Sequence, residues 1–546
     1  MKMIFKLMLI SRFLLPVFVI VPMFLSASVA AIVPAPKKMQ LKGGVFRCRS
    51  ADLTSVAAFH NDASIPKEGY RLEVTPESIG VWSSDEAGAF YAVKTLEQLA
   101  KKTYVPDSLK AEVKKYESDY EIPSVLIEDS PTFRWRGFMI DEARHFLGKE
   151  AVLRQLDLMA EHKLNVFHWH IVDDQGWRLL LPRHPELVEY GAVRPCSVAY
   201  GKGAEWVGKA QTLKYVLNTE KYGPYFYTPQ DVREICRYAK ERHITVVPEI
   251  ELPGHERALL AARPDLSCRG EKIGRVPRVY WSIEHDVLCA GNDEAIKYLE
   301  SIFDEVCELF GSSPYIHIGG DECPKTMWKK CAKCQRRMKE IGAKDERELQ
   351  VWFTRHFTDF LAGKGRRIVG WDEVLYGDAP KSVVGMSWRN SAANGAGGDF
   401  ISACEAAAKG HDMVLTPSKY CYFSRRQGLS LDPYPYYEPE PYAEQKPGDL
   451  TKELTLENAY SFNPYAGFPE NLRSKILGVQ ASVWSESIFT RFDFEWKAWP
   501  RTCALAEIAW TGPGARDFDD FSKRMEIHRR RLMKQKVNCA PLGDGR

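Results

Sequence analysis

Two acidic residues stand next to each other in the segment YIHIGGDEC, residues 315–323. Asp321 and Glu322 follow an apolar run and two glycines. Enzymes that cut sugar linkages usually place two carboxyl groups about 5 to 9.5 Å apart, across the bond that breaks. Neighbouring Cα atoms are only about 3.8 Å apart. The segment therefore predicts acid–base chemistry, and it leaves open which group is the second partner.

The acids follow one of eight short apolar segments that alternate with helical stretches from about residue 132 onward. Strands that alternate with helices indicate a parallel sheet, and eight such repeats predict a (β/α)8 TIM barrel with long loop insertions. A doubly wound sheet is the structural alternative, but eight parallel strands favour closure. The candidate strands are GFMID (137–141), NVFHWHIV (165–172), ITVVPEI (244–250), YIHIGG (315–320), RIVGW (367–371), VVGMSW (383–388), DMVLT (412–416) and ILGVQASVW (476–484).

Residues 32–127 have a different pattern and form a predicted small α/β domain. The stretch YRLEVTPESIGVWSS (70–84) alternates as two strands around a turn, and DEAGAFYAVKTLEQLAKK (85–102) has the acidic start and basic end of a helix. We therefore divide the chain into a signal peptide (1–30), this N-terminal domain, a barrel catalytic domain (128–512) and a C-terminal helix packed on the barrel (513–546).

Polar and aromatic side chains follow nearly every predicted strand. In a TIM barrel the C-terminal ends of the strands form the active-site face, so these side chains should meet there. Flat indole faces stack on pyranose rings, and carboxylates and arginine bind ring hydroxyls, so the set predicts a carbohydrate pocket. Its members are Arg144, Asp173, Asp174, Glu251, His255, Asp321, Glu322, Trp371, Trp388, Tyr420, Tyr422, Trp484 and Glu486.

His168 and His170 stand two apart on a predicted strand and therefore share one of its faces. They lack the H-E-x-x-H pattern and a third ligand of matching spacing. We interpret them as barrel-interior residues in hydrogen-bond networks rather than as a metal pair.

The ordered set of motifs resembles the family 20 glycoside hydrolases, the β-N-acetylhexosaminidases. HIGGDE, DEARHF, NVFHWHIVDD, PEIELPGH and VWSE carry the resemblance, which covers about residues 32–541. It implies a small N-terminal domain on a (β/α)8 barrel and an exo-acting enzyme that removes terminal β-linked N-acetylglucosamine or N-acetylgalactosamine. In this family the substrate assists its own cleavage: the 2-acetamido oxygen is the nucleophile, and water opens the oxazolinium intermediate with retention.

The resemblance also implies a role for each matching residue. Glu322 would be the general acid and then the general base, and Asp321 would orient the acetamido group and stabilise the charge that develops on it. The substrate-binding residues would be Tyr422 on the acetamido oxygen, Trp371, Trp388 and Trp484 as pocket walls, Arg144 and Glu486 on the 3- and 4-hydroxyls, and Asp173 and His255 behind Glu322.

Two positions depart from the family pattern. Glu251 stands where the family often has aspartate, and Ser424 stands where an aspartate commonly holds the 6-hydroxyl. Serine is shorter and a weaker partner, so the contact to the 6-position stays open. Two alternatives follow: Arg425 or Arg426 fills the gap, or an anionic 6-substituent is favoured.

Thirteen cysteines, an odd number, cannot all pair within the chain. Cys268 and Cys289 bracket a loop-like stretch and are the expected disulfide of an exported protein. Cys331 and Cys334 form a C-x-x-C with Cys323 upstream, but a second C-x-x-C or a histidine pair is missing. We therefore expect no metal site and no cofactor.

The first thirty residues predict export. Lys2, Lys6 and Arg12 precede or flank the apolar run FLLPVFVIVPMFL, and the small residues Ser28-Val29-Ala30 suit cleavage of a secretory signal peptide. These three cations account for the whole formal charge of +3, so the rest of the chain is neutral and lacks the electrostatic footprint of a nucleic-acid binder. We expect a periplasmic or secreted protein without a membrane span, whose partner is an oligosaccharide or glycoconjugate that contains N-acetylhexosamine.

Three other functions remain open from the sequence. A barrel that binds amino sugars without cutting them is disfavoured by the intact Asp321-Glu322 pair. A hydrolase with two separated carboxylates, such as Glu251 and Glu322, would also cut sugars that lack the acetamido group. A metal-dependent hydrolase would lose its activity to a strong chelator.

Overall fold

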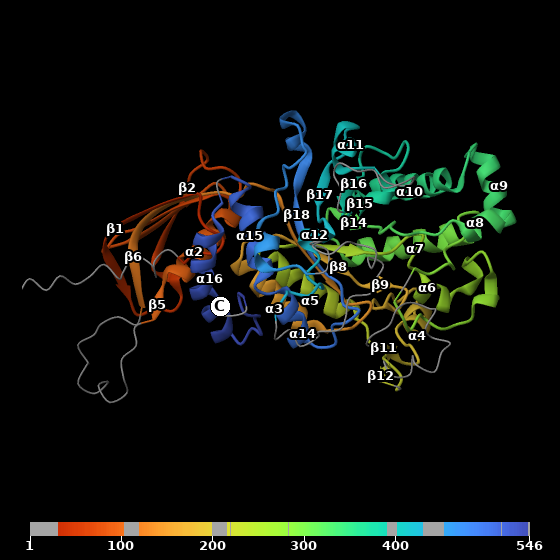
Figure 1. Ribbon diagram of the computed structural model, residues 1–546, viewed down its shortest axis with the longest axis horizontal. Helices are drawn as coiled ribbons and strands as arrows, with labels where there is room; N and C mark the ends of the chain where they lie inside the picture. The colour runs from red at the N-terminus through yellow and green to blue at the C-terminus, as the bar shows by residue number, and fades with distance from the viewer. Residues whose placement is uncertain are drawn as a thin grey trace, which may run out of the picture.

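The computed structural model describes residues 31–102, 120–198, 216–218, 220–281, 283–389, 401–429, 453–514 and 516–543. The predicted signal peptide, residues 1–30, lies outside these ranges. Figure 1 shows an N-terminal sheet at one end of the molecule and the barrel toward the other. Within the described ranges, no helix has both the length and the apolar composition that a membrane crossing requires.

Eight parallel strands close into a barrel, which confirms the predicted fold class. Around the barrel the order is β13, β14, β15, β16, β17, β18, β7 and β8, so the first and last of these strands in the chain, β7 and β18, lie side by side. Each strand overlaps the apolar segment that predicted it. Their bounds are β7 Trp135–Asp141, β8 Val166–His170, β13 Thr245–Glu249, β14 Tyr315–His317, β15 Arg367–Trp371, β16 Val384–Ser387, β17 Met413–Leu415 and β18 Ile476–Val483.

The barrel strands are apolar along most of their length because both of their faces are buried. Every residue of β7 and of β18 is buried. Inside the barrel, Val247 and Val369 belong to a core cluster of their own. Glu249 at the end of β13 pairs in register with His170 of β8 and with His317 of β14. The sheet thus holds the ends of neighbouring strands at one level.

Helices cover the outside of the barrel and connect its strands. α5 (Pro229–Lys240) begins with a capping box between Thr228 and Asp231, and proline occupies its first turn, where a missing N–H costs nothing. The remaining helices of the barrel region are α3 Lys149–Glu161, α4 Glu186–Gly191, α6 Arg257–Ala262, α7 Asp293–Leu309, α8 Thr326–Lys330, α9 Ala332–Ile341, α10 Glu346–Ala362, α11 Ala403–Ala408, α12 Ser418–Cys421, α13 Leu456–Tyr460, α14 Arg491–Ala498 and α15 Arg501–Thr511. Two further pairs of short strands lie outside the barrel sheet: β9 Val172–Asp173 pairs with β10 Gly176–Trp177, and β11 Ser197–Val198 pairs with β12 Val216–Asn218.

A second sheet precedes the barrel. Its strand order is β1, β6, β3, β4 and β2, with β5 beside β6, and α2 (Glu86–Leu99) packs against it. The predicted pair of strands around a turn is the antiparallel β3–β4 pair, and the predicted helix is α2, which Asp85 caps. The strand bounds are β1 Lys38–Cys48, β2 Ala57–Asn61, β3 Tyr70–Val74, β4 Ile79–Ser83, β5 Lys101–Lys102 and β6 Tyr120–Asp129.

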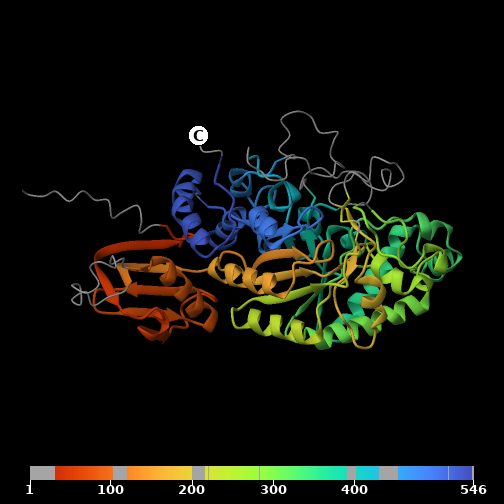
Figure 2. The same cartoon turned by 90° about the horizontal axis from the view of Figure 1, so that it is seen from below.

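The C-terminal helix α16 (Phe518–Lys534) lies beside α15, where the N-terminal sheet meets the barrel (Figures 1 and 2). Arg524 of α16 forms a buried ion pair of 2.7 Å with Glu507 of α15. Trp510, also on α15, donates to Asp129 of β6 at 2.8 Å. A barrel helix thus binds both the C-terminal helix and the N-terminal sheet.

Candidate active site

The acid pair follows β14 after two glycines that the fold requires. Gly319 and Gly320 have φ angles of +62° and +100°, which residues with a side chain rarely adopt. A Cβ atom on Gly319 would lie 1.6 Å from Oε2 of Glu251, and one on Gly320 would lie 2.2 Å from Cγ1 of Val374. The two glycines therefore let the chain pass between these side chains on its way to the mouth of the barrel.

Asp321 and Glu322 both lie close to His255, which follows β13. Nε2 of His255 lies 3.8 Å from Oδ2 of Asp321 and 3.6 Å from Oε2 of Glu322. His255 and Glu322 themselves have positive φ angles, +50° and +46°. Such backbone costs a non-glycine residue about 1–3 kcal/mol and concentrates at functional sites. The structure thus brings three predicted site residues together from two strand ends.

Two buried aspartates hold His255 from the side opposite to the acid pair. Its Nδ1 lies 3.4 Å from Oδ1 of Asp173 and 3.3 Å from Oδ2 of Asp174. Burial alone would lower the pKa of His255, but the charges of Asp173 and Asp321 raise it well above its ordinary value. The imidazole is therefore positively charged at neutral pH, and this charge lies next to the two acids.

The Asp321 carboxyl is the more enclosed of the two acids. Its side chain is 14% exposed, whereas that of Glu322 is 34% exposed. Burial raises the pKa of Asp321, the charge of His255 opposes the rise, and neighbouring acids, Glu373 foremost, add to it, so that the pKa reaches about 7. A carboxyl that titrates near neutrality is typical of acid–base sites.

Arg144, after β7, is fixed by an acid on one side and a ring on the other. Its Nη2 lies 2.7 Å from Oδ2 of Asp173, and its guanidinium carbon lies 5.0 Å from the centre of the Trp484 ring. Burial raises the pKa of Glu486, and the Arg144 charge opposes that rise. Arg144 and Glu486, the two residues expected to bind ring hydroxyls, therefore lie in one electrostatic environment.

The three predicted indoles and Tyr422 form one aromatic wall. The ring centre of Trp484 lies 5.7 Å from that of Trp371 and 5.9 Å from that of Tyr422. Trp388 stacks on Tyr422 with ring centres 6.2 Å apart and planes 12° from parallel. Because aromatic walls of this kind line small-molecule sites, the arrangement suits a sugar ring.

A carboxylate that the sequence analysis did not single out, Glu249, lies beneath this wall. It accepts a hydrogen bond from Nε1 of Trp371 at 2.9 Å and lies 2.8 Å from Nδ1 of His317. Nε2 of His168 lies 3.0 Å away, and His170 hydrogen-bonds to the same carboxylate. The two strand histidines are thus buried and hydrogen-bonded, as the sequence analysis expected. The available signal was an acid on an apolar strand, where a charge is costly unless it is paired.

A second acid that the sequence analysis missed, Glu373, lies beside the pair in the short 3-10 helix η7 (Asp372–Leu375). It accepts from the Glu322 N–H at 3.4 Å and from Nε1 of Trp388 at 3.2 Å, and Arg389 pairs with it. Glu322, Glu373 and Arg389 line a cavity of about 90 Å³. The signal was a pair of acids directly after a predicted strand.

Two other residues that follow the seventh strand, Tyr420 and Arg426, have partners within the protein. Tyr420 stacks on Phe462, with ring centres 5.4 Å apart, whereas Tyr422 contacts Trp484 in the aromatic wall. Arg426, one of the two arginines considered for the gap at Ser424, lies 3.9 Å from Glu453. That arginine therefore already has an acidic partner within the protein.

Barrel enzymes carry their chemistry at the C-terminal ends of the strands. The adjacent acids, the histidine, the arginine and the aromatic wall at these ends therefore indicate a barrel enzyme that acts on sugars. Comparison with known families gives the same answer. Residues 133–513 match "Glycosyl hydrolase family 20, catalytic domain", and residues 47–130 match "Glycosyl hydrolase family 20, domain 2". The chain belongs to glycosyl hydrolase family 20.

Individual relatives agree with this assignment. The chain is 38% identical over 474 residues to a beta-hexosaminidase of Porphyromonas gingivalis, and the alignment covers 85% of this chain but 54% of that protein, about half its length. It is 30% identical over 508 residues to a beta-hexosaminidase of Akkermansia muciniphila, covering 92% of this chain and 91% of that one. A solved family 20 exo-β-N-acetylglucosaminidase of Vibrio harveyi, in complex with N-acetylglucosamine, matches with a TM-score of 0.77 at 29% identity, covering 94% of this chain and 79% of the other.

Proposed function

We propose that the chain is an exo-acting, retaining β-N-acetylhexosaminidase that releases terminal β-linked N-acetylglucosamine or N-acetylgalactosamine by substrate-assisted catalysis. The 2-acetamido oxygen attacks the anomeric carbon while the leaving-group oxygen takes a proton. Water then opens the oxazolinium intermediate, and the sugar leaves with its configuration retained. Family membership and the names of the relatives support the activity, and the arrangement of the acids supports the mechanism.

The observation that carries the mechanism is the burial of the acids that could replace the acetamido group. Glu251 is 1% exposed, its carboxylate packs against Gly319, and burial raises its pKa well above the ordinary value, which disfavours the charged form of this enclosed acid. Asp173 is also 1% exposed and lies 2.7 Å from Arg144. The enclosure of these two acids supports a nucleophile that comes from the substrate.

The difference in exposure between the two acids supports the catalytic role proposed for each. Glu322 is the more open acid, so in this proposal it protonates the leaving oxygen and later takes a proton from water. Asp321 is enclosed beside the charged His255, so it accepts the acetamido N–H and stabilises the positive charge that develops on that group. The substrate-binding residues are Tyr422 on the acetamido oxygen, Trp371, Trp388 and Trp484 as walls, Arg144 and Glu486 on ring hydroxyls, and Asp173 and His255 behind the acids.

Two matched substrates test this function. The purified chain should hydrolyse an aryl β-glycoside of N-acetylglucosamine and leave the corresponding glucoside uncut, because glucose lacks the acetamido nucleophile. The initial rates of aryl release, measured side by side at equal concentration, give the ratio. Comparable rates on both substrates would require a protein nucleophile and would overturn the substrate-assisted mechanism.

Alanine in place of Gly319 should damage the site without touching substrate. Left-handed backbone costs a residue with a side chain about 1–2 kcal/mol, and the new methyl group would displace the Glu251 carboxylate. A misplacement of about 1 Å can cost roughly 10²-fold in rate, so we expect kcat/KM on the aryl N-acetylglucosaminide to fall by that order. Gly43→Ala is the control, since a Cβ atom there meets nothing within 4 Å. Equal kcat/KM for the two variants would contradict the prediction.

A further inference from the structure

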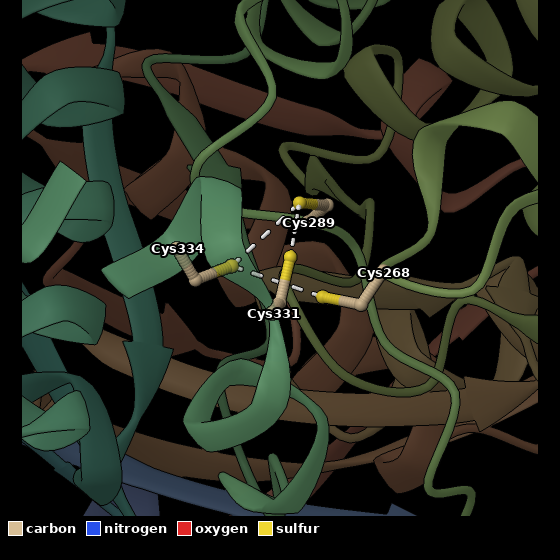
Figure 3. Close-up of side chains that lie close together, drawn as sticks. All are labelled: Cys268, Cys289, Cys331 and Cys334. Atoms are coloured by element: carbon tan, nitrogen blue, oxygen red, sulfur yellow. Dashed lines mark hydrogen bonds between the residues drawn. The ribbon is translucent and has the colours of Figure 1, made fainter. Parts of the chain in front are cut away.

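Four cysteine sulfurs gather at one point beside the barrel, and Figure 3 shows their side chains directed toward one another. Sγ of Cys289 lies 3.6 Å from Sγ of both Cys331 and Cys334, and Sγ of Cys268 lies 3.7 Å from that of Cys334. All four sulfurs lie within 4.8 Å of one another. The expected Cys268–Cys289 disulfide is not formed, because all thirteen cysteines, each within the described ranges, are free thiols.

We propose that these four cysteines bind one zinc ion as thiolates. In a tetrahedral site with zinc–sulfur bonds of about 2.3 Å, neighbouring sulfurs are about 3.8 Å apart. The observed separations of 3.6 to 3.7 Å fit that tetrahedron. A closed set of four protein ligands is typical of a structural rather than a catalytic ion.

The backbone builds the first ligand pair from residues that are distant in the chain. Ser267 and Leu288 form an isolated antiparallel bridge, so Cys268 and Cys289, each one residue beyond it, lie diagonally across the bridge with their sulfurs within 4.8 Å of each other. The Cys289 N–H also donates to the carbonyl of Leu266 at 2.9 Å. This pair takes the place of the second C-x-x-C that the sequence lacks.

The second ligand pair comes from the start of a helix. Cys331 is the N-terminal capping residue of α9, and its side chain makes no capping hydrogen bond there. Cys334 lies in the first turn of that helix, where the partial positive charge of the helix N-terminus favours thiolates. The two-residue spacing between these cysteines is common in structural zinc sites.

The segments that carry the two pairs are packed closely enough to hold the geometry. A Cβ atom on Gly291 would lie 2.2 Å from the backbone carbonyl of Lys333, so only glycine permits this approach. Nε1 of Trp328 donates to the carbonyl of Leu288 at 2.9 Å, and the Gly291 backbone N–H donates to the sulfur of Cys289. Hydrogen bonds of this kind orient metal ligands.

The ion would fasten together the two loops that carry the candidate catalytic residues. Cys268 and Cys289 lie in the segment after β13, which also carries His255, and the other two cysteines lie in the segment after β14, which carries Asp321 and Glu322. His255 and Glu322 approach to 3.6 Å across this junction. This consequence rests on the proposed function, whereas the zinc site itself does not.

Zinc fits the donor set. Four thiolates in a tetrahedron select zinc or iron among common ions, and zinc has no redox chemistry that an oxidising compartment would disturb. Each thiol releases its proton when it binds the ion, so binding tightens as the pH rises. Disulfides between the same cysteines are the competing outcome in an exported chain.

Metal analysis of the purified chain tests the proposal. Elemental mass spectrometry should find one zinc per chain, and the protein denatured in acid should have the mass of the fully reduced chain. Replacement of zinc by Co²⁺ should give the intense visible absorption of a tetrahedral cobalt–thiolate centre. A metal-free chain whose mass lacks the four hydrogens of two disulfides would overturn the site, and one iron per chain would overturn its assignment to zinc.

A variant pair assigns the ion to these cysteines. The double variant C331S/C334S should lose the zinc and unfold at a temperature several degrees lower, whereas C236S, which removes a half-buried thiol on α5 outside the cluster, should keep both. Zinc retained by the double variant would place the ion elsewhere. If the double variant does not fold, the cobalt spectrum of the unmodified chain still decides. Because metal content is measured without a sugar substrate, a failure of the proposed function leaves this result unaffected.

Discussion

Asparagine in place of Asp321 should lower kcat/KM for an aryl N-acetyl-β-glucosaminide by about 10²–10³-fold, the loss typical of removing one transition-state stabiliser. The amide has nearly the same shape as the carboxylate but carries no negative charge, so it cannot balance the charge on the reacting acetamido group. The interaction is strongest in the transition state, so kcat should fall by a factor similar to that of kcat/KM. Steady-state kinetics of the purified variant give both constants.

The dependence of kcat/KM on pH provides an independent test of the role of Asp321. Burial, together with the neighbouring acids, raises the pKa of Asp321 to about 7. Below that pH the free enzyme holds the neutral acid, which no longer carries the needed charge, so kcat/KM should fall by up to about tenfold per pH unit on the acid side. In Asp321→Asn this limb should disappear, because the titrating group is gone.

The unfolding temperature of Asp321→Asn distinguishes loss of the carboxylate charge from loss of the folded structure. Because the folded state raises the pKa of Asp321, the folded chain binds more protons than the unfolded chain between about pH 4 and pH 7, and this group's contribution to stability falls as the pH rises through that window. Asp321→Asn should therefore unfold at the same or a higher temperature at pH 7. The surface variant Asp157→Asn is the control for both assays. Near-normal rates in Asp321→Asn would exclude the proposed role of the acetamido group.

The barrel could be predicted because its physical signal is local. A strand buried on both faces is a short continuous apolar run, and β15 and β18 are visible as such in the sequence. The rule that chemistry lies at the C-terminal ends then selects Arg144, His255 and the acid pair, because each stands a few residues after its strand. The structure brings them together as that rule requires.

The residues that sequence reasoning missed depend on contacts between distant segments. Glu249 is important because its register places it between His170 and His317 on the two neighbouring strands, and no spacing within one strand reveals this. The expectation of no metal site rested on the lack of a second C-x-x-C or a histidine pair to complete Cys331 and Cys334. The pair that completes the cluster becomes visible only when the loops after β13 and β14 fold against each other. Motifs within a short stretch of sequence therefore predicted Asp321 and Glu322, but not the groups that depend on contacts between distant segments.

Glutamine in place of Glu322 should reduce the release of a sugar leaving group by about 10²–10⁴-fold, the usual contribution of a general acid–base group. A sugar hydroxyl leaves poorly without a proton, so its cleavage depends fully on the acid. An aryl group that is stable as an anion needs no proton, so the first step on that substrate should be much less affected. Comparing kcat/KM for a disaccharide and for an activated aryl glycoside measures the difference, and Glu305→Gln, a buried acid on α7, is the control.

In the proposed mechanism the second step then becomes limiting, because water must be deprotonated to open the oxazolinium ring and glutamine cannot take the proton. Added azide is already an anion and needs no base, so it should raise the turnover of the activated aryl substrate by Glu322→Gln and leave the unmodified enzyme unaffected. The product should be the β-glycosyl azide, since attack on the ring from the face that the leaving group vacated retains the configuration. An equal loss on both substrates, with no response to azide, would show that Glu322 positions the site rather than transferring protons.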